Sequence, residues 1–522
     1  MASQSSSPPS FKRIRLIFED DFDAAYSVIT AFIQEPQAAD AVEEFIIDLP
    51  SRLGRDTRTP RGISQTPASL LTPIKFDAEA YQSLTEHAKS LGLAEDHTKD
   101  MIAALEWKRD LTLRYPNGED QESRYNRLFY NVNPKNGNYN MTMATILISL
   151  CSNIISLRIN NVRPYTVLAD FLTRNNYGEL PRPFLGRLEK VLVHGYQTLD
   201  PRTYSPLVSL HCFRFFHRLP SVETFSFDAV GDYQAQEAYF PSKVSAGIKK
   251  IHITHSLISG YLIGTMIRLP VALEEFSYTD GLCLWSRDAG ALPVLYPKTL
   301  GKCLSEHKDT LKRLDITTHG YPSPFNDSRG DEHEINTELW EEQLESEETS
   351  RNEALCPYFE KDRDDSPKGL PLWLQDIPET QRYYPNSIGL LHDFTKLTHL
   401  SIRLGVLLGY YVHFDADCPE RKQSPSPVPS VPYRLVDCLP PNLEYLKLYG
   451  YERGKYPAID VYVDDFLHNK AERFPNLKVI EGIREHIPAE QLQSGRHWIP
   501  EEQLWERPTD GLDWLEAEPA SS

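Results

Sequence analysis

Six basic side chains recur at matching places in this 522-residue chain, each between or just after apolar residues. They are Arg158, Lys190, Lys250, Arg313, Arg403 and Lys447. Guanidinium and ammonium groups bind carboxylates and phosphates, and arginine can do so through two parallel hydrogen bonds. Equivalent places hold two histidines and two tyrosines, which are His194, His252, Tyr445 and Tyr449. If these ten residues share one face, that face would bind an acidic or phosphorylated segment of a protein partner.

Motifs that support catalysis or a metal ion are weak in this sequence. There is no glycine-rich phosphate loop, no G-x-S-x-G elbow and no H-E-x-x-H pair. His252 and His255 are three residues apart, but they lie in and after an expected strand, without an acidic or cysteine companion, so we interpret them as structural or surface histidines. The acidic run at 331–334 lacks the ligand spacing of a calcium loop. We therefore expect no enzyme activity, no cofactor and no metal site.

A short apolar pattern explains the spacing of the ten residues. It reads apolar, two variable residues, apolar, one variable residue, apolar, and it first appears clearly as Ile154-Leu157-Ile159. Seven further copies begin at Leu188, Val222, Ile248, Leu273, Leu311, Leu397 and Leu443. This pattern is typical of the strand of a leucine-rich repeat. Since side chains alternate between the two faces of a strand, the apolar residues should face the core and the variable ones the opposite surface.

The stretches between several copies have helical patterns, namely 164–173, 260–268 and 298–307, and each leads into the next strand. We predict an α/β fold, an irregular leucine-rich-repeat solenoid with parallel strands on the concave face and helices on the convex face. Weaker copies lie at 11–16 and 42–47, and residues 76–130 have a helical pattern. The predicted parts are a disordered tail at 1–10, N-terminal repeats and a helical cap at 11–140, the solenoid at 141–485 with an acidic insertion at 320–385 and a Ser/Pro loop at 421–432, and a C-terminal cap or tail at 486–522.

The charge balance argues against binding to nucleic acid. The formal net charge is −19 at pH 7, which opposes generic contact with phosphate backbones. Much of it lies in residues 327–365, which contain fifteen acidic and four basic residues. By contrast, the variable positions of the eight clear copies carry six basic and three acidic residues, a net of +3. This excess favours an acidic ligand, although a chance split or an acidic insertion folded over the face would explain it as well.

Cysteine usage and hydropathy indicate an intracellular protein. The seven cysteines are scattered, with no C-x-x-C pair, which is typical of reduced thiols. Residues 1–10 are polar and lack the apolar core of a signal peptide, and no run approaches the ~20 apolar residues of a membrane span. We expect the protein in the cytoplasm or the nucleus, without contact with a membrane.

Three segments, 219–225, 439–446 and 474–477, share a helix end followed by proline, asparagine or serine, an apolar residue and a strand. In this form the chain resembles the degenerate leucine-rich repeats of fungal F-box/LRR proteins over roughly residues 140–485. That resemblance implies a substrate receptor that works with the subunits of an SCF-type ubiquitin ligase. Only ten residues precede the first strand pattern, however, which is too few for an F-box. We therefore favour a non-enzymatic protein–protein interaction module, and keep as the alternative a ligase receptor with a lost or diverged F-box.

Overall fold

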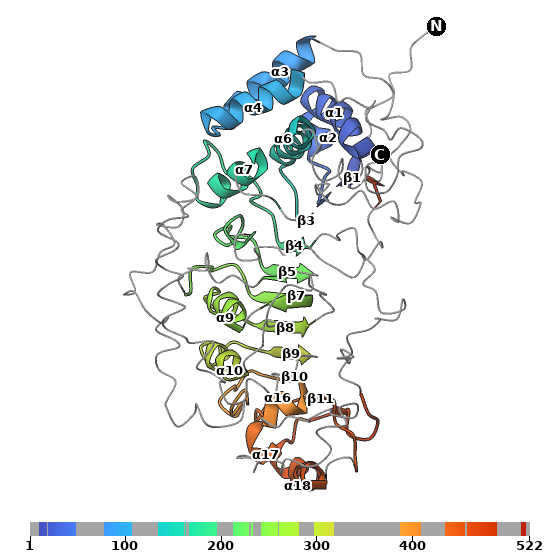
Figure 1. Ribbon diagram of the computed structural model, residues 1–522, viewed down its shortest axis with the longest axis vertical. Helices are drawn as coiled ribbons and strands as arrows, with labels where there is room; N and C mark the ends of the chain where they lie inside the picture. The colour runs from blue at the N-terminus through green and yellow to red at the C-terminus, as the bar shows by residue number, and fades with distance from the viewer. Residues whose placement is uncertain are drawn as a thin grey trace, which may run out of the picture. The chain divides into compact units, whose positions relative to one another are not determined.

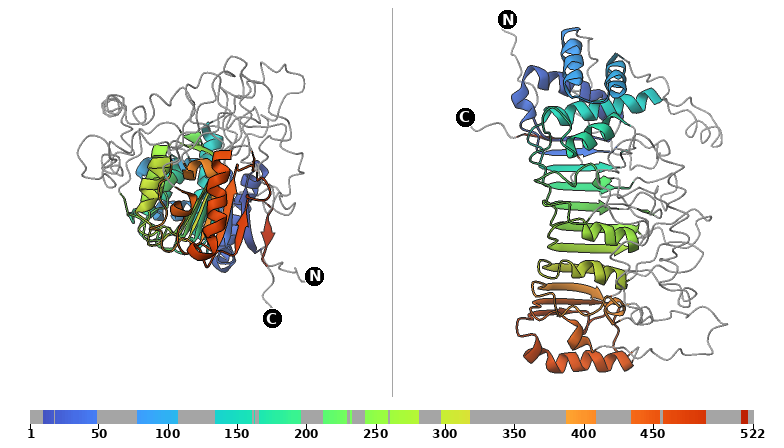
Figure 2. Two further views of the ribbon diagram at one scale, coloured as in Figure 1. Left: turned by 90° about the horizontal axis from the view of Figure 1, so that it is seen from below. Right: turned by 90° about the vertical axis from the view of Figure 1, so that its left-hand side faces the viewer.

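The computed structural model describes residues 10–17, 19–48, 78–106, 134–160, 162, 166–195, 212–228, 231–232, 242–258, 260–280, 297–317, 387–408, 434–454, 457–487 and 513–517. The predicted acidic insertion, the Ser/Pro loop and most of the two predicted tails lie outside these residues. The chain forms two compact units, unit 1 from residues 1–228 and 504–522, and unit 2 from residues 229–503. In each unit, parallel strands lie side by side and helices pack against them (Figures 1 and 2).

Among its described residues, the sheet of unit 1 contains five parallel strands and one short antiparallel strand. In spatial order the parallel strands are β1 (Phe11–Leu16), β2 (Glu44–Ile47), β3 (Ser156–Asn160), β4 (Lys190–His194) and β5 (Thr224–Asp228). On its other side, β1 pairs with the antiparallel strand β13 (Leu515–Glu516). The register places Leu157 opposite Val191, and Val191 opposite Phe225. The apolar positions of successive copies therefore stack on one another.

The helices described in unit 1 pack against one another. They are α1 (Glu19–Gln34), α2 (Pro36–Ala39), α3 (Ala78–Ser90), α4 (Glu95–Glu106), α6 (Pro134–Leu150) and α7 (Val167–Asn176). Helix α1 also packs against β1. Helix α6 contacts α1, α4 and α7, and its residues 142–149 are all buried. The side chain of Thr166 caps α7 by accepting the N–H of Ala169. The predicted helical character of 76–130 is confirmed for 78–106, and that of 164–173 by α7.

The strands described in unit 2 pair in parallel. Its described strands, in spatial order, are β7 (Lys250–Ile258), β8 (Glu275–Asp280), β9 (Arg313–Thr317), β10 (His399–Arg403), β11 (Tyr445–Tyr449) and β12 (Val479–Glu481). The short strand β6 (Gly231–Asp232) lies outside this order and pairs with the end of β7. The described helices of unit 2 are α9 (Gly260–Arg268), α10 (Pro297–Ser305), α16 (Leu404–Leu408), α17 (Leu435–Cys438) and α18 (Pro457–Arg473). In Figure 1, α9 and α10 lie to the left of β7, β8 and β9. The helices expected at 260–268 and 298–307 are thus confirmed.

The core of each unit consists of the apolar positions of the repeated pattern. In unit 1 the rings of Phe213, Phe225 and Phe227 form a buried cluster with centroids 4.4 to 5.1 Å apart. In unit 2, Leu400 lies in register between Leu314 and Leu446, and all three are at most 1% exposed. The predicted α/β class with mostly parallel strands is therefore confirmed in both units. The finer assignment to the leucine-rich repeats stays a prediction.

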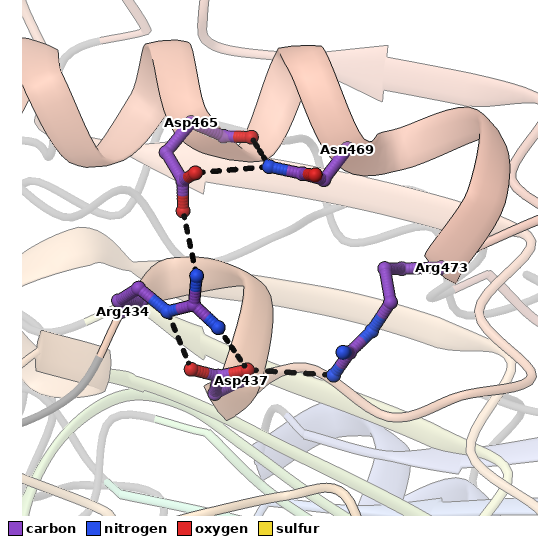
Figure 3. A network of polar contacts seen from close by, with 5 residues as sticks. All are labelled: Arg434, Asp437, Asp465, Asn469 and Arg473. Carbon is purple, nitrogen blue, oxygen red and sulfur yellow. Dashed lines mark hydrogen bonds and ion pairs between the residues drawn. The ribbon is translucent and has the colours of Figure 1, made fainter.

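A surface network joins α17 to α18 near the last strands of unit 2 (Figure 3). Arg434 donates from Nε to Asp437 over 2.8 Å, and Arg473 reaches the same carboxylate over 3.4 Å. Arg434 also forms an ion pair with Asp465 at 3.9 Å. The two arginines are more than half exposed and the two carboxylates are partly exposed, and ion pairs near solvent contribute at most about 1 kcal/mol each. The position of α18 depends more on its buried residues, such as Phe466.

No helix among the described residues is long and apolar enough to cross a lipid bilayer. Helix α6, for example, has 17 residues and packs against α1, α4 and α7 of unit 1. Its apolar residues are therefore explained by the core of that unit.

The turn after β12 supplies a test of the packing in unit 2. Gly482 has a φ of +83°, and a Cβ there would overlap the carbonyl oxygen of Leu448 in β11. Gly454 has a similar φ of +87°, but a Cβ there would meet nothing within 4 Å. We predict that Gly454→Ala costs about 1–2 kcal/mol of unfolding free energy through the left-handed backbone alone, and Gly482→Ala about 3–4 kcal/mol. Urea unfolding would measure both values, and equal losses would contradict the close packing at Gly482.

Candidate functional site

The variable positions of unit 2 form two straight rows across its sheet. The first row, in register from β7 to β12, is Lys250, Glu275, Arg313, His399, Tyr445 and Val479. The second row is His252, Ser277, Asp315, Ser401, Lys447 and Glu481. Most of these side chains are half-buried or exposed, whereas the apolar residues between them are buried. We call the two rows, together with Arg403 and Tyr449 at the ends of β10 and β11, the unit 2 face.

Neighbouring strands neutralise part of the charge on this face. Lys250 forms an ion pair with Glu275 at 3.3 Å, and Lys447 approaches Glu481 at 4.0 Å. Arg313 lies between them in the first row, is exposed, and makes no ion pair within the described part of the chain. Lys250 and Lys447 therefore already have carboxylate partners on neighbouring strands. Arg313, on β9, is exposed to solvent.

Aromatic side chains gather over β10 and β11. The rings of His399 and Tyr445 stack with centroids 5.8 Å apart and an interplanar angle of 23°. Tyr449 donates its hydroxyl to Asp315 over 3.4 Å, and Lys447 lies 4.9 Å from the centre of the Tyr449 ring. Both tyrosines are half-exposed. Because these contacts fix the rings from two sides, the face presents a preformed aromatic surface beside a cation.

Burial and local partners set the ionisation of this face. Partial burial, followed by a hydrogen bond to Glu481, raises the pKa of Tyr445 to about 12, so its hydroxyl stays protonated. Burial also raises the pKa of Asp315, against the opposing effect of Lys447 and the Tyr449 hydroxyl. These groups mainly hold one another in place. The hydroxyls of Tyr445 and Tyr449 are therefore already engaged with carboxylates of the same face.

The two histidines on β7 have separate surroundings. The ring of His252 contacts the hydroxyl of Ser277 at 2.8 Å, and burial lowers its pKa, so it is neutral near pH 7. His255 is exposed and has a φ of +47°, at the point where the pairing of β7 with β8 becomes irregular. Within the described ranges, no group of three His, Cys, Asp or Glu residues could hold a metal ion.

In unit 1 the same variable positions recur, but those at the carboxyl ends of the strands are buried. Arg158 on β3 is half-buried and Lys190 on β4 is exposed. The positions at the carboxyl ends of β2 to β5 form a row in register, and all four are buried: Asp48 at 7% exposure, Asn160 at 1%, His194 at 1% and Asp228 at 7%. The expectation that His194 lies on an exposed face is therefore wrong. Side-chain alternation assigns His194 to the variable face, but it does not predict whether that position is buried.

This buried row is held by polar contacts between strands. Asn160 donates to Asp48 over 2.5 Å, and the Nδ1 of His194 lies 3.1 Å from the carbonyl oxygen of Gly195. Burial, and then the charge of Arg158, lowers the pKa of His194 to about 4, so the imidazole is neutral and its Nδ1–H donates to that carbonyl. The sequence carried a signal for the row, because Asp, Asn, His and Asp follow four successive apolar patterns.

The ten predicted residues thus divide between the two units. Unit 2 brings seven of them onto one face, namely Lys250, His252, Arg313, Arg403, Tyr445, Lys447 and Tyr449. Unit 1 holds the other three, Arg158, Lys190 and His194. The alternation also predicted His399 on this face, but sequence reasoning missed its stacking on Tyr445 and the contribution of Glu481, because both depend on which strands are neighbours.

Comparison with known proteins gives no match. No family model, no curated protein and no solved structure is significantly similar to this chain. The resemblance to F-box/LRR proteins therefore stays a prediction, and the functional argument rests on the geometry of the two units.

The buried histidine of unit 1 makes stability depend on pH in a predictable direction. Because the pKa of His194 is about 4 in the folded protein and about 6.5 when unfolded, the unfolded chain binds the proton more strongly between these values. Stability from this residue is complete above pH 6.5 and is lost as the pH falls toward 4, by about 3 kcal/mol. We predict that His194→Gln flattens this dependence in urea unfolding from pH 7 to 4.5. The exposed His392→Gln is the control, and unchanged slopes in both variants would contradict the assignment.

Proposed function

We propose that this chain is a non-enzymatic protein–protein interaction module whose partner binds the unit 2 face. The observation that carries the proposal is the register of β7 to β12, which lines up half-exposed polar and aromatic side chains in two rows. Side chains held on strands lose little conformational freedom on binding, so such a face recognises a partner at a low entropic cost. Arginine and tyrosine are also the residue types that most often dominate binding energy.

The charges on this face favour an acidic contact at one place. Since Lys250 and Lys447 lie beside Glu275 and Glu481, their charges are largely compensated. Arg313 can offer its guanidinium to a carboxylate or a phosphate of the partner. The stacked rings of His399 and Tyr445 lie on the next two strands and offer an apolar surface beside that cation. The partner that fits is a protein with an acidic or phosphorylated residue next to an apolar side chain.

The ionisable groups support binding better than catalysis. The hydroxyl of Tyr449 and the carboxylate of Asp315 bond to each other, and His252 contacts Ser277. Burial raises the pKa of Cys438 to about 12, and raises that of Cys151 as well, so neither thiol is a ready nucleophile. No described group on the face combines an activated nucleophile with a base.

The resemblance to fungal F-box/LRR proteins supports a second role for the same face. In that role the chain is a substrate receptor of an SCF-type ubiquitin ligase, and the bound partner is a substrate. The two roles differ in what else accompanies the chain in the cytoplasm or nucleus. A cullin and its small adaptor would be present with a ligase receptor and absent from a stand-alone binding module.

We predict that Arg313→Glu and Tyr445→Ala each reduce the recovery of specific partners at least about tenfold, because one reverses the exposed charge and the other removes half of the ring stack. The tagged full-length chain would be purified from its own cells, and the proteins that accompany it measured by quantitative mass spectrometry. Lys308→Glu and Tyr462→Ala are matched controls, since they also reverse a basic charge and remove a tyrosine ring, but on residues outside the face.

Circular dichroism must first show that the four variants are folded. If Arg313→Glu and Tyr445→Ala then retain every partner of the wild-type chain, the unit 2 face is not the binding site. If the two variants lose some partners and keep a cullin with its adaptor, the lost proteins are substrates and the ligase role holds.

A further inference from the structure

The outer edge of β1 in unit 1 is occupied by a short segment from the far end of the chain. Residues 513–517 run antiparallel to β1, with Phe11 opposite Glu516 and Arg13 opposite Leu515. The N–H of Ala517 donates to the carbonyl of Ser10 over 2.9 Å. An open strand edge is a template for another extended chain, so this segment binds as an added strand.

Trp514 is the anchor of this segment. Its ring packs against Phe11 in an edge-on arrangement with centroids 5.1 Å apart. Its indole Nε1–H donates to the carboxylate of Asp21 over 3.0 Å. Asp21 is fully buried in the first turn of α1, where it also accepts from the backbone N–H of Ile17 and from Arg15. The anchor therefore combines ring packing with a hydrogen bond to a buried anion.

A second charge contact flanks the anchor. Arg15 is almost fully buried, and its guanidinium reaches Asp21 at 3.2 Å and Asp513 at 3.4 Å. The carboxylate of Asp513 is 63% exposed. The site thus recognises three features in sequence: a carboxylate, a tryptophan directly after it, and an extended backbone that pairs with β1.

The segment is far from β1 along the chain, and a whole folded unit lies between them in the sequence. Residues 229–503, which precede it along the chain, form unit 2, while the segment itself belongs to unit 1. Its pairing with β1 involves two strand residues, and Leu515 and Glu516 are exposed. Such a short strand depends on its anchor and on its attachment to the same chain, which raises its effective concentration at the edge.

We propose that the edge formed by Phe11, Arg15 and Asp21 is a peptide-binding site, and that the chain's own segment 513–517 is its resident, displaceable ligand. The partner that fits is an extended segment of another protein in which an acidic residue directly precedes tryptophan. Such a segment would make the same contacts and compete with the chain's own residues. This site lies on unit 1 and does not depend on the unit 2 face.

A labelled synthetic peptide of residues 511–518 tests the proposal, with binding followed by fluorescence anisotropy. The full-length Trp514→Ala chain has lost the anchor of its own segment and should bind the peptide saturably. The wild-type chain should bind it at least about tenfold more weakly, because its own segment competes. A peptide with phenylalanine at the tryptophan position keeps the ring but loses the bond to Asp21, so its affinity for Trp514→Ala should fall about tenfold.

A peptide of scrambled sequence and a peptide with alanine at the tryptophan position are the controls, and neither should bind. Asp513→Lys is a second variant with a weakened segment, and its exposed position makes folding secure. If neither variant binds the peptide at millimolar concentration, β13 is a fixed part of the sheet and the proposal is wrong. Equal binding to wild type and Trp514→Ala would place the peptide elsewhere and overturn it as well. A wild-type dimer that becomes a monomer on Trp514→Ala would assign the edge to a second copy instead of to the chain's own segment.

Discussion

The parallel register between neighbouring strands is the constraint on which each unit depends. It places Leu157, Val191 and Phe225 in one line in unit 1, and Leu314, Leu400 and Leu446 in another in unit 2. A slip of one residue would turn every apolar side chain of a strand toward solvent, so burial enforces the register strongly. Helices such as α6 and α9 then cover the apolar face, and the opposite face is left to the variable residues.

That opposite face is determined by pairs of neighbouring strands more than by any single strand. Lys250 meets Glu275 because β7 and β8 are adjacent, and the rings of His399 and Tyr445 stack because β10 and β11 are adjacent. Such cross-strand pairs are worth a few tenths to about 1 kcal/mol each, which is enough to fix orientation without closing the face to a partner. Their larger effect is on specificity, since they decide which charges remain for a ligand.

The strands could be predicted from the sequence, because a pattern of three apolar positions at fixed spacing has one simple physical reading. The helices at 260–268 and 298–307 were predicted from the helical spacing of apolar residues between two strand patterns. Side-chain alternation along a strand does not predict whether a residue on the variable face is buried by other parts of the chain. His194 lies at a variable position of the pattern, yet it is buried. Nor does alternation predict contacts across long gaps. The ion pair of Lys447 with Glu481 and the docking of Trp514 need the three-dimensional neighbours, and isolated residues carry no periodicity that would reveal them.

The two kinds of surface follow from the way a parallel sheet ends. Inside a sheet, backbone groups are paired and only side chains can recognise a ligand, as on the unit 2 face. At an edge the backbone itself is available, and β1 uses it for residues 513–517. The buried carboxylate of Asp21 makes this edge selective, because an anion held by Arg15, by the N–H of Ile17 and by the first turn of α1 favours a further N–H donor over a bare apolar ring. Tryptophan offers both a ring that packs on Phe11 and an N–H that donates to Asp21. The edge therefore selects a side chain by both its ring and its hydrogen-bond donor, whereas the repeated pattern that builds the sheet requires only that a side chain be apolar.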